Sequence, residues 1–106
     1  LKKAGVYDNT LIFFLTDHGV SHLRGKQFCH DEGVKVPMIV KFPDNQFKGT
    51  VRKDLVKQID LLPTSLAFAG LSIPENIQGE NIFDEKWGFF EKIEGNCYCV
   101  ILKVLL

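Results

Sequence analysis

The sequence is poor in cysteine, has no excess of charge of either sign and lacks a long apolar run. The spacings of Cys29, Cys97 and Cys99 match no zinc-binding or redox motif, so we interpret each as a buried free thiol. Lysine plus arginine (13) balances aspartate plus glutamate (13), which favours neither nucleic acid nor an acidic membrane surface as a partner. No apolar run approaches the ~20 residues of a membrane span, so we expect none.

The remaining composition is typical of a globular protein. Of 106 residues, 45% are hydrophobic and 25% charged, which allows one small domain or part of a larger one. The first five residues, Leu1-Lys2-Lys3-Ala4-Gly5, resemble the last turn of a helix with a glycine stop. Because the chain opens on such a helix end, we expect it to be a fragment.

The most informative stretch is an apolar segment that runs into polar residues. Residues 10–16 lack polar alternation, which predicts a strand buried on both faces, as in a parallel sheet covered by helices. Asp17 and His18 follow this strand, at the edge where open α/β sheets bind ligands, and Gly19 allows a sharp turn. The pair could hold a divalent cation, or His18 could be a hydrogen-bonded structural residue.

The rest of the chain supplies further α/β elements. Residues 20–33 form a polar loop crowded with ionisable side chains. Asp60 is a suitable N-cap for a helix with Leu62, Leu66 and Ala69 on one face, and Gly70 stops it. The other expected elements are a strand over residues 34–42, a turn at 43–45 and a half-buried strand over 54–59.

The C-terminal tail differs in amino-acid composition from the rest of the chain. Trp87, Phe89 and Phe90 cluster after an acidic turn, and the last ten residues are mostly apolar. Two interpretations stay open: a terminal strand, or a sequence that is not the natural continuation. We therefore divide the chain into residues 1–83 and a tail of uncertain origin, 84–106.

Several motifs together resemble the C-terminal part of the catalytic domain of sulfatases, in the alkaline phosphatase superfamily. The first are Thr16-Asp17-His18-Gly19, Gly25-Lys26 and Asp31-Glu32-Gly33 followed by the strand Val36-Pro37-Met38-Ile39-Val40. Downstream, the similar segments are Gln58-Ile59-Asp60-Leu61-Leu62-Pro63-Thr64, Ala69-Gly70, Ile73-Pro74 and Gly79. The resemblance covers residues 1–83 and implies a fragment of a mixed or parallel sulfatase-like sheet with flanking helices.

The resemblance also implies roles for individual residues. Asp17 and His18 correspond to two ligands of the active-site calcium, and Lys26 to the catalytic lysine that contacts the sulfate; the alternative for Lys26 is a solvated loop lysine. A fixed cation and an ammonium group suit the negative charge that develops during sulfate ester cleavage. His22 or Arg24 could contact the substrate as well.

We expect structural roles for two acidic residues and a histidine in the same loop. Asp31 and Glu32 are expected to shape the turn before the second strand. His30 stands where relatives often have tyrosine, and we expect it to be buried and hydrogen-bonded.

Sulfatases use a formylglycine nucleophile made within a Cys/Ser-x-Pro/Ala-x-Arg motif, which this chain lacks. Ser72-Ile73-Pro74 matches only the first half of that motif, because Asn76 replaces the arginine. The resemblance thus implies a fragment of a sulfuric ester hydrolase for sulfated small molecules or glycans. The alternatives are a phosphatase- or phosphodiesterase-type superfamily member, in which Asp17 and His18 would hold zinc, and a non-catalytic pseudo-enzyme piece. Sulfatases are commonly secreted, periplasmic or lysosomal; the sequence leaves the compartment open.

Overall fold

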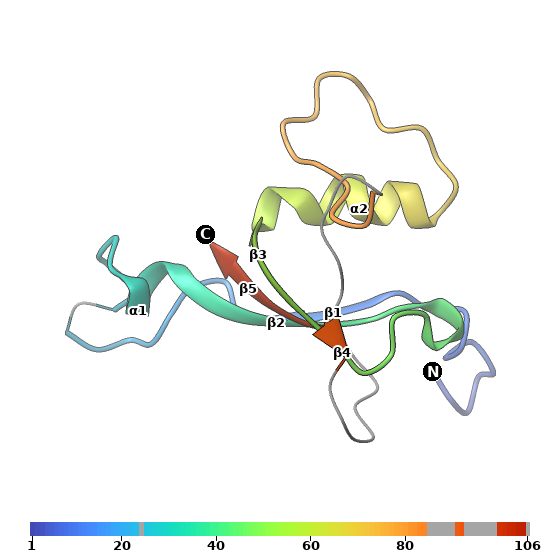
Figure 1. Ribbon diagram of the computed structural model, residues 1–106, viewed down its shortest axis with the longest axis horizontal. Helices are drawn as coiled ribbons and strands as arrows, with labels where there is room; N and C mark the ends of the chain where they lie inside the picture. The colour runs from blue at the N-terminus through green and yellow to red at the C-terminus, as the bar shows by residue number, and fades with distance from the viewer. Residues whose placement is uncertain (24, 85–90, 93–99, 106) are drawn as a thin grey trace.

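The computed structural model describes residues 1–23, 25–84, 91–92 and 100–105. Its elements, in chain order, are β1 (Ile12–Leu15), α1 (Asp31–Val34), β2 (Lys35–Lys41), η1 (Pro43–Asn45), β3 (Thr50–Lys57), η2 (Gln58–Asp60), α2 (Leu61–Phe68), β4 (Glu91–Lys92) and β5 (Val100–Leu105). The described strands form one sheet in the order β1-β2-β5-β3-β4 (Figure 1). Because β3 and β5 are parallel and the other neighbours antiparallel, the sheet is mixed. The expected α/β class is confirmed.

The surroundings of β1 differ from the expectation. β1 runs antiparallel to β2, from the pair Ile12 and Lys41 to the pair Leu15 and Met38. It lies at one end of the strand order, and Phe14 is 71% exposed. The prediction of a strand buried on both faces in a parallel arrangement is therefore wrong for this chain. An unbroken apolar run does not distinguish a strand that is covered on both faces from a strand that the described residues cover on one face only.

The core is built on β2, whose side chains alternate as a half-buried strand requires. Val36, Met38 and Val40 are almost completely buried, and Val56 from β3 and Ile82 join them. Phe42, just after β2, contacts the rings of Phe47, Phe68 and Phe83 with centroids 5.3, 4.8 and 4.2 Å away. These contacts join the end of β2 to α2 and to residues 82–83.

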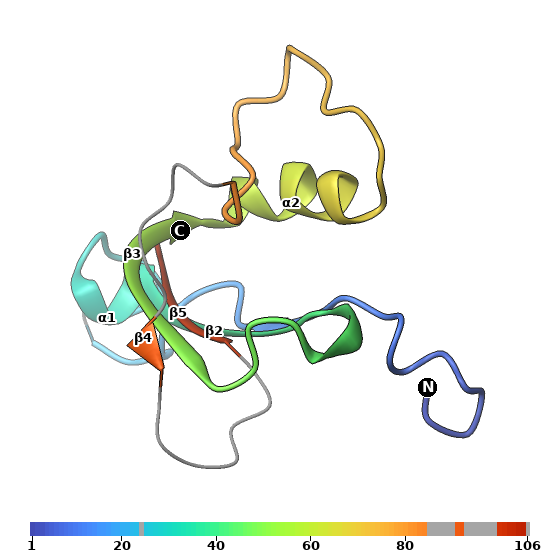
Figure 2. The same ribbon diagram turned by 45° about the vertical axis from the view of Figure 1, so that its right-hand side comes forward.

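β3 starts earlier than the sequence indicates and leads directly into η2 and α2. Leu55 is exposed while Val56 is buried, which is the expected half-buried pattern, but the strand begins at Thr50 and ends before Ile59. Its pairing with β5 is irregular between Val51 and Leu55. The ribbon of β3 curves strongly and brings α2 to one side of β1 and β2 (Figure 2).

α2 departs from the sequence expectation at its N-terminus and in its buried face. Asp60 occupies the N-cap position, but its side chain makes no capping hydrogen bond to this helix. Leu62 is 56% exposed, whereas Pro63 and Thr64 are buried, so the face with Leu62, Leu66 and Ala69 is not the one that packs inward. The first turn must follow η2 and the buried Asp60, and this fixes how the helix is rotated. The predicted glycine stop is confirmed, because Gly70 has φ +70°.

The N-terminal residues are tied to β2 by a buried lysine. Lys41 is 4% exposed, and its Nζ donates to the carbonyls of Tyr7, Asp8 and Thr10 at 2.5, 3.1 and 3.2 Å. Before this segment, the amides of Gly5 and Val6 bond to the carbonyls of Lys2 and Leu1, with Gly5 at φ +69°. This is the bond pattern of a helix end stopped by glycine, as predicted.

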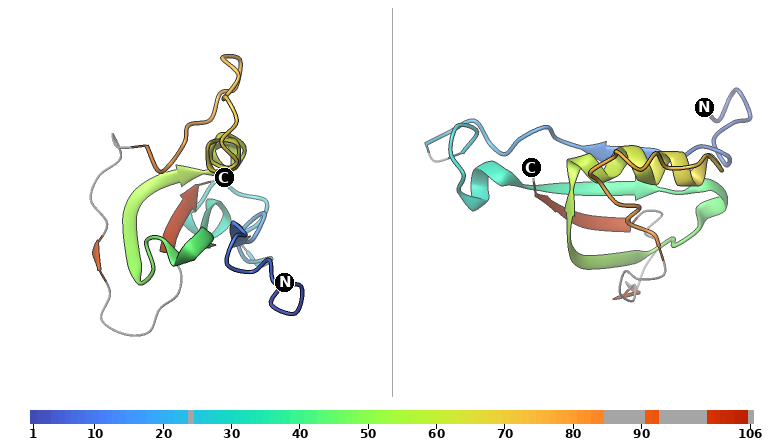
Figure 3. Two further views of the ribbon diagram at one scale, coloured as in Figure 1. Left: turned by 90° about the vertical axis from the view of Figure 1, so that its right-hand side faces the viewer. Right: turned by 90° about the horizontal axis from the view of Figure 1, so that it is seen from above.

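The two ends of the long axis carry different parts of the chain. Seen from above, α1 lies near one end and the N-terminus near the other, with α2 between them (Figure 3). In the tail, residues 100–105 form strand β5 between β2 and β3, in agreement with the terminal-strand interpretation. Trp87, Phe89, Phe90, Cys97 and Cys99 lie outside the described residues. The origin of residues 84–106 stays untested.

Candidate functional site

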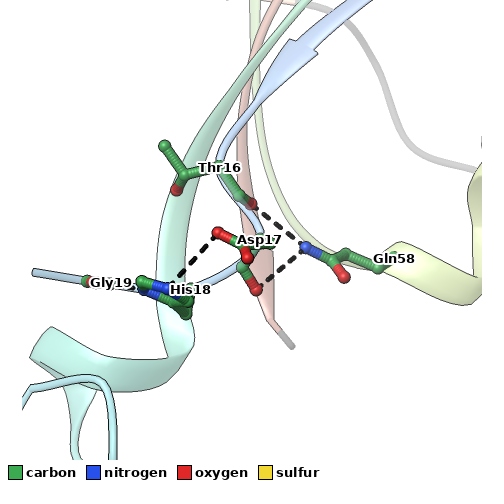
Figure 4. A network of polar contacts seen from close by, with 5 residues as sticks. All are labelled: Thr16, Asp17, His18, Gly19 and Gln58. Carbon is green, nitrogen blue, oxygen red and sulfur yellow. Dashed lines mark hydrogen bonds and ion pairs between the residues drawn. The ribbon is translucent and has the colours of Figure 1, made fainter.

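Asp17 and His18 lie just beyond the last residue of β1, as the sequence indicates. The Asp17 side chain is 86% exposed and that of His18 29%. The Asp17 Oδ1 atom is 3.5 Å from His18 Nε2 (Figure 4). The structure therefore brings the two predicted metal ligands together on the surface, next to the carboxyl end of the strand.

The backbone decides which nitrogen of His18 is available. His18 Nδ1 is 2.7 Å from the carbonyl oxygen of Gly19. Since a carbonyl can only accept, we assign the proton to Nδ1, which leaves a lone pair on Nε2 in the neutral ring. Nε2 is then the ring nitrogen available to a ligand, and it is the one that lies 3.5 Å from the Asp17 carboxylate oxygen.

The spacing of these two donor atoms fits a divalent cation. Neighbouring ligands of an ion bound at about 2.3–2.6 Å lie roughly 3.3–3.7 Å apart when they meet it at right angles. The 3.5 Å between Asp17 Oδ1 and His18 Nε2 falls in that range. Among the described residues, no three His, Cys, Asp or Glu side chains gather into a metal-binding group.

Gly19 is required by close packing rather than by an unusual backbone angle. Its amide donates to the Gly33 carbonyl at 2.9 Å, and a Cβ at this position would lie 1.7 Å from the Glu32 carbonyl oxygen. Its φ is not among the positive values of the chain. The loop after Asp17-His18 therefore packs directly against α1, and Gly19 and Glu32 line one cavity.

A cavity of about 640 Å³ opens beside Asp17 and His18. Its wall combines these polar groups with apolar side chains of Val20, Val36 and Pro37. Glu32 and Lys35 also line it, and Lys35 pairs with Asp31 at 2.5 Å. As expected, Asp31 and Glu32 form the turn that precedes β2, here the first turn of α1.

Lys26 and His22 lie together in a second cavity of about 380 Å³. Lys26 is exposed, and its amide donates to the Val20 carbonyl at 3.0 Å. His22 Nδ1 is 2.9 Å from the Leu23 carbonyl oxygen. Ser21 lines both cavities, but Lys26 is not among the residues of the Asp17–His18 cavity. Asp17 and His18 thus line one cavity, and His22 and Lys26 line a neighbouring cavity. The structure does not place the four residues in a single cavity.

Other residues of this loop depart from the expectation or lie outside the description. His30 is exposed and stacks on Phe28 with ring centroids 6.1 Å apart, so the prediction of a buried His30 is wrong. Cys29 is exposed as well, because the loop projects away from the core, and this corrects the prediction of a buried thiol. Arg24 lies outside the described residues.

Sequence reasoning missed Gln58 as a neighbour of the site. Its Nε2 donates to the carbonyls of Thr16 and Asp17 at 3.1 and 3.4 Å (Figure 4). The two partners are 42 and 41 residues apart from it in sequence, and no local pattern signals such a contact. Only the path of β3 into η2 brings Gln58 to the end of β1.

Comparison with known proteins identifies the family. The family described as N-sulphoglucosamine sulphohydrolase, C-terminal, matches residues 18–91 of this chain. The chain belongs to this sulfatase family. No solved structure matches the chain, and no helix within the described part of this sulfatase chain has the length and apolar character to cross a membrane.

Curated relatives include sulfatases and a broader member of the superfamily. An ulvan-active sulfatase of Formosa agariphila is 36% identical over 80 residues, 76% of this chain and 13% of the relative. An N-acetylglucosamine-6-O-sulfatase of Bacteroides thetaiotaomicron is 34% identical over 89 residues, covering 77% and 15%. A multifunctional alkaline phosphatase superfamily protein of Trinickia caryophylli is 31% identical over 87 residues, covering 77% and 17%. This sulfatase chain thus spans less than a fifth of these relatives' length.

Proposed function

We propose that the chain supplies part of the active site of a sulfatase that hydrolyses sulfate monoesters of carbohydrates. The carrying observation is the pairing of Asp17 Oδ1 with His18 Nε2, 3.5 Å apart at the end of β1, in a chain of the sulfatase family. In this proposal Asp17 and His18 hold calcium. Lys26 contacts the sulfate and acts in catalysis, and His22 binds the substrate.

The chemistry of the residues supports these roles. Negative charge grows on the sulfate oxygens and on the leaving oxygen as the ester bond breaks. Calcium would supply a fixed positive charge there, and Asp17 provides the hard carboxylate oxygen that this ion prefers. Lys26 adds a compact ammonium with rotatable N–H donors, and His22 in the same cavity adds a second donor. The nucleophile, a formylglycine, has no source motif in these 106 residues.

A carbohydrate substrate is supported by the names of relatives. The Bacteroides thetaiotaomicron relative is named for N-acetylglucosamine-6-O-sulfate chemistry and the Formosa agariphila relative for ulvan. The cavity next to Asp17 and His18 has both apolar and polar walls. Such a wall suits a sugar ring, which presents carbon–hydrogen faces and hydroxyl edges.

A chimaeric enzyme tests the proposal. In the Formosa agariphila sulfatase, the 80-residue matching segment is replaced by its counterpart from this chain. The chimaera is assayed on ulvan, 4-nitrophenyl sulfate and 4-nitrophenyl phosphate. We expect sulfate ester turnover, and a fall in kcat/KM of about 10²–10³ with Asp17→Asn or Lys26→Met, because each removes charge stabilisation from the transition state.

Matched substitutions at exposed positions serve as controls. Asp44→Asn and Lys48→Met make the same chemical changes in and after η1, and we expect each to leave kcat/KM within about twofold. Unchanged turnover with Lys26→Met would remove the role assigned to this lysine.

The second candidate is phosphate ester hydrolysis, which the Trinickia caryophylli relative favours because its name places it in the alkaline phosphatase superfamily without restricting it to sulfate. Both ester types present a tetrahedral anion to the same cation and lysine. A chimaera that turns over only 4-nitrophenyl phosphate would establish this candidate and overturn the first.

A further inference from the structure

The backbone just after β1 accepts hydrogen bonds from a side chain that lies far away in the sequence. The ladder between β1 and β2 ends at the pair Leu15 and Met38. Thr16 and Asp17 follow, and their carbonyl oxygens lie beyond that ladder. Both accept from a single side-chain group, Gln58 Nε2, at 3.1 and 3.4 Å.

This contact constrains the peptide that carries Asp17. Successive carbonyls of an extended strand point to opposite sides, so one amide reaches both only where the chain bends. The amide nitrogen of glutamine carries two hydrogens, which allows one for each carbonyl. Gln58 therefore bridges the carbonyls of Thr16 and Asp17 at the point where the strand gives way to the loop that carries His18 (Figure 4).

Gln58 itself is held by a buried anchor. It is half-buried and begins η2, and the preceding residue, Lys57, donates its amide to Asp60 Oδ2 at 2.8 Å. Asp60 is fully buried, and its Oδ1 accepts the amide of Glu80 at 3.0 Å. The short turn between Lys57 and Asp60 is thus fixed at both ends, and Gln58 reaches the end of β1 from a rigid base.

We propose that Gln58 is a positioning residue, whose amide holds the Thr16–Asp17 peptide so that the Asp17 carboxylate faces His18 and the pair binds a divalent cation more tightly. The positioning of Asp17 rests on the contacts described above. The effect on cation affinity rests in addition on the proposed function of the Asp17–His18 pair.

The first experiment measures the backbone directly. Amide nitrogen–proton NMR spectra are recorded for the 106-residue chain, for Gln58→Met and Gln58→Ala, and for the control Gln46→Ala. Methionine keeps the length of the side chain without a donor, which retains packing that alanine would lose. We expect both Gln58 variants to shift the amide signals of residues 17–19 and to leave those of β2 in place, while Gln46→Ala changes neither. Unchanged signals at residues 17–19 in Gln58→Met would overturn the proposal.

The second experiment titrates calcium chloride into the metal-free chimaeric enzyme and into its Gln58→Met variant by isothermal titration calorimetry, because the 106-residue chain alone offers only two of the candidate ligands. We expect the Gln58→Met chimaera to have a calcium Kd about 5–10 times higher, because the Asp17 carboxylate is then less well oriented. Equal Kd values for the two chimaeras would overturn the effect on cation affinity. If the chimaera with Gln58 intact does not bind calcium, the calcium assignment of the proposed function fails, while the first experiment still decides whether Gln58 positions Asp17.

Discussion

Asp60 is a fully buried carboxylate with a hydrogen bond to each oxygen. Its donors are the amides of Lys57 and Glu80, which belong to segments on either side of α2. The carbonyl of Asp60 accepts the hydroxyl of Thr64 at 2.6 Å, and that hydroxyl oxygen accepts the amide of Ile82 at 3.2 Å. One residue thereby joins η2, α2 and the segment leading to the buried Ile82. Burying this charge is tolerable because it is hydrogen-bonded.

We predict that Asp60→Asn lowers the free energy of unfolding by about 2–3 kcal/mol. Asparagine keeps one acceptor but turns an NH₂ group toward a backbone amide, so one buried donor loses its partner. Urea unfolding followed by circular dichroism measures the change. The control is Asp44→Asn, which makes the same replacement at an exposed position with φ +52°, a region that asparagine tolerates. Equal stability of the two variants would contradict the anchoring role of Asp60.

The neighbouring strands β1 and β2 differ in how deeply their side chains are buried. β2 has antiparallel neighbours on both sides, β1 and β5, and it supplies Val36, Met38 and Val40 to the core. β1 has β2 on one side, and its central Phe14 is 71% exposed. The strand that leads to the candidate site is therefore held mainly by β2, by Lys41 and, at its end, by Gln58.

We predict that Met38→Ala lowers the free energy of unfolding by about 2–5 kcal/mol, whereas Phe14→Ala lowers it by less than about 1 kcal/mol. Met38 is fully buried, so its removal leaves a cavity, while Phe14 already faces outward. Denaturant unfolding of the two variants under identical conditions measures both values. A larger loss for Phe14→Ala would mean that the outer face of β1 is covered in solution.

At the scale of the whole molecule, the groups proposed for sulfate chemistry are divided between two cavities. Asp17 and His18 line one of about 640 Å³, and His22 and Lys26 line the other, of about 380 Å³. Two protein ligands are fewer than the six to eight oxygen donors, at about 2.3–2.6 Å, that calcium usually takes. The sequence also lacks the formylglycine motif. The 106 residues thus hold part of the machinery that the proposed reaction needs.

We predict that the 106-residue chain alone shows no sulfatase turnover. The physical reason is that positioning and charge stabilisation cannot replace the covalent nucleophile of the proposed reaction. The measurement is release of 4-nitrophenol from 4-nitrophenyl sulfate with calcium present, with the chimaeric enzyme as the positive control. Turnover above the buffer rate would contradict the division of the active site between this chain and other residues.

Much of the fold could be predicted because its signals are local. The second strand, the turn at residues 43–45 and the glycine stop at Gly70 follow from alternation and backbone preferences. The prediction of β1 as a strand was correct, but its parallel, buried setting was not, because neighbours decide burial. His30 and Cys29 were expected to be buried from the habits of their residue types, and the projecting loop exposes both.

The candidate site could likewise be predicted only where its signals are local. Asp17 and His18 are consecutive residues after an apolar run, so their place together at a strand end could be predicted from the sequence. The family comparison agrees with the sulfatase motifs around them. The contact from Gln58 to Thr16 and Asp17 spans about 40 residues and depends on the path of β3. The roles of Asp17, His18, His22 and Lys26 stay predictions.

The sequence by itself determined the family, the strand that ends in Asp17-His18, and the stops and turns of the chain. These depend on residue types and on spacings of a few positions. Only the tertiary structure decided that β1 lies at the edge of a mixed sheet, that Lys26 and Asp17 line different cavities, and that Gln58 holds the end of β1. Those features depend on contacts between distant segments, whose energies no local pattern specifies.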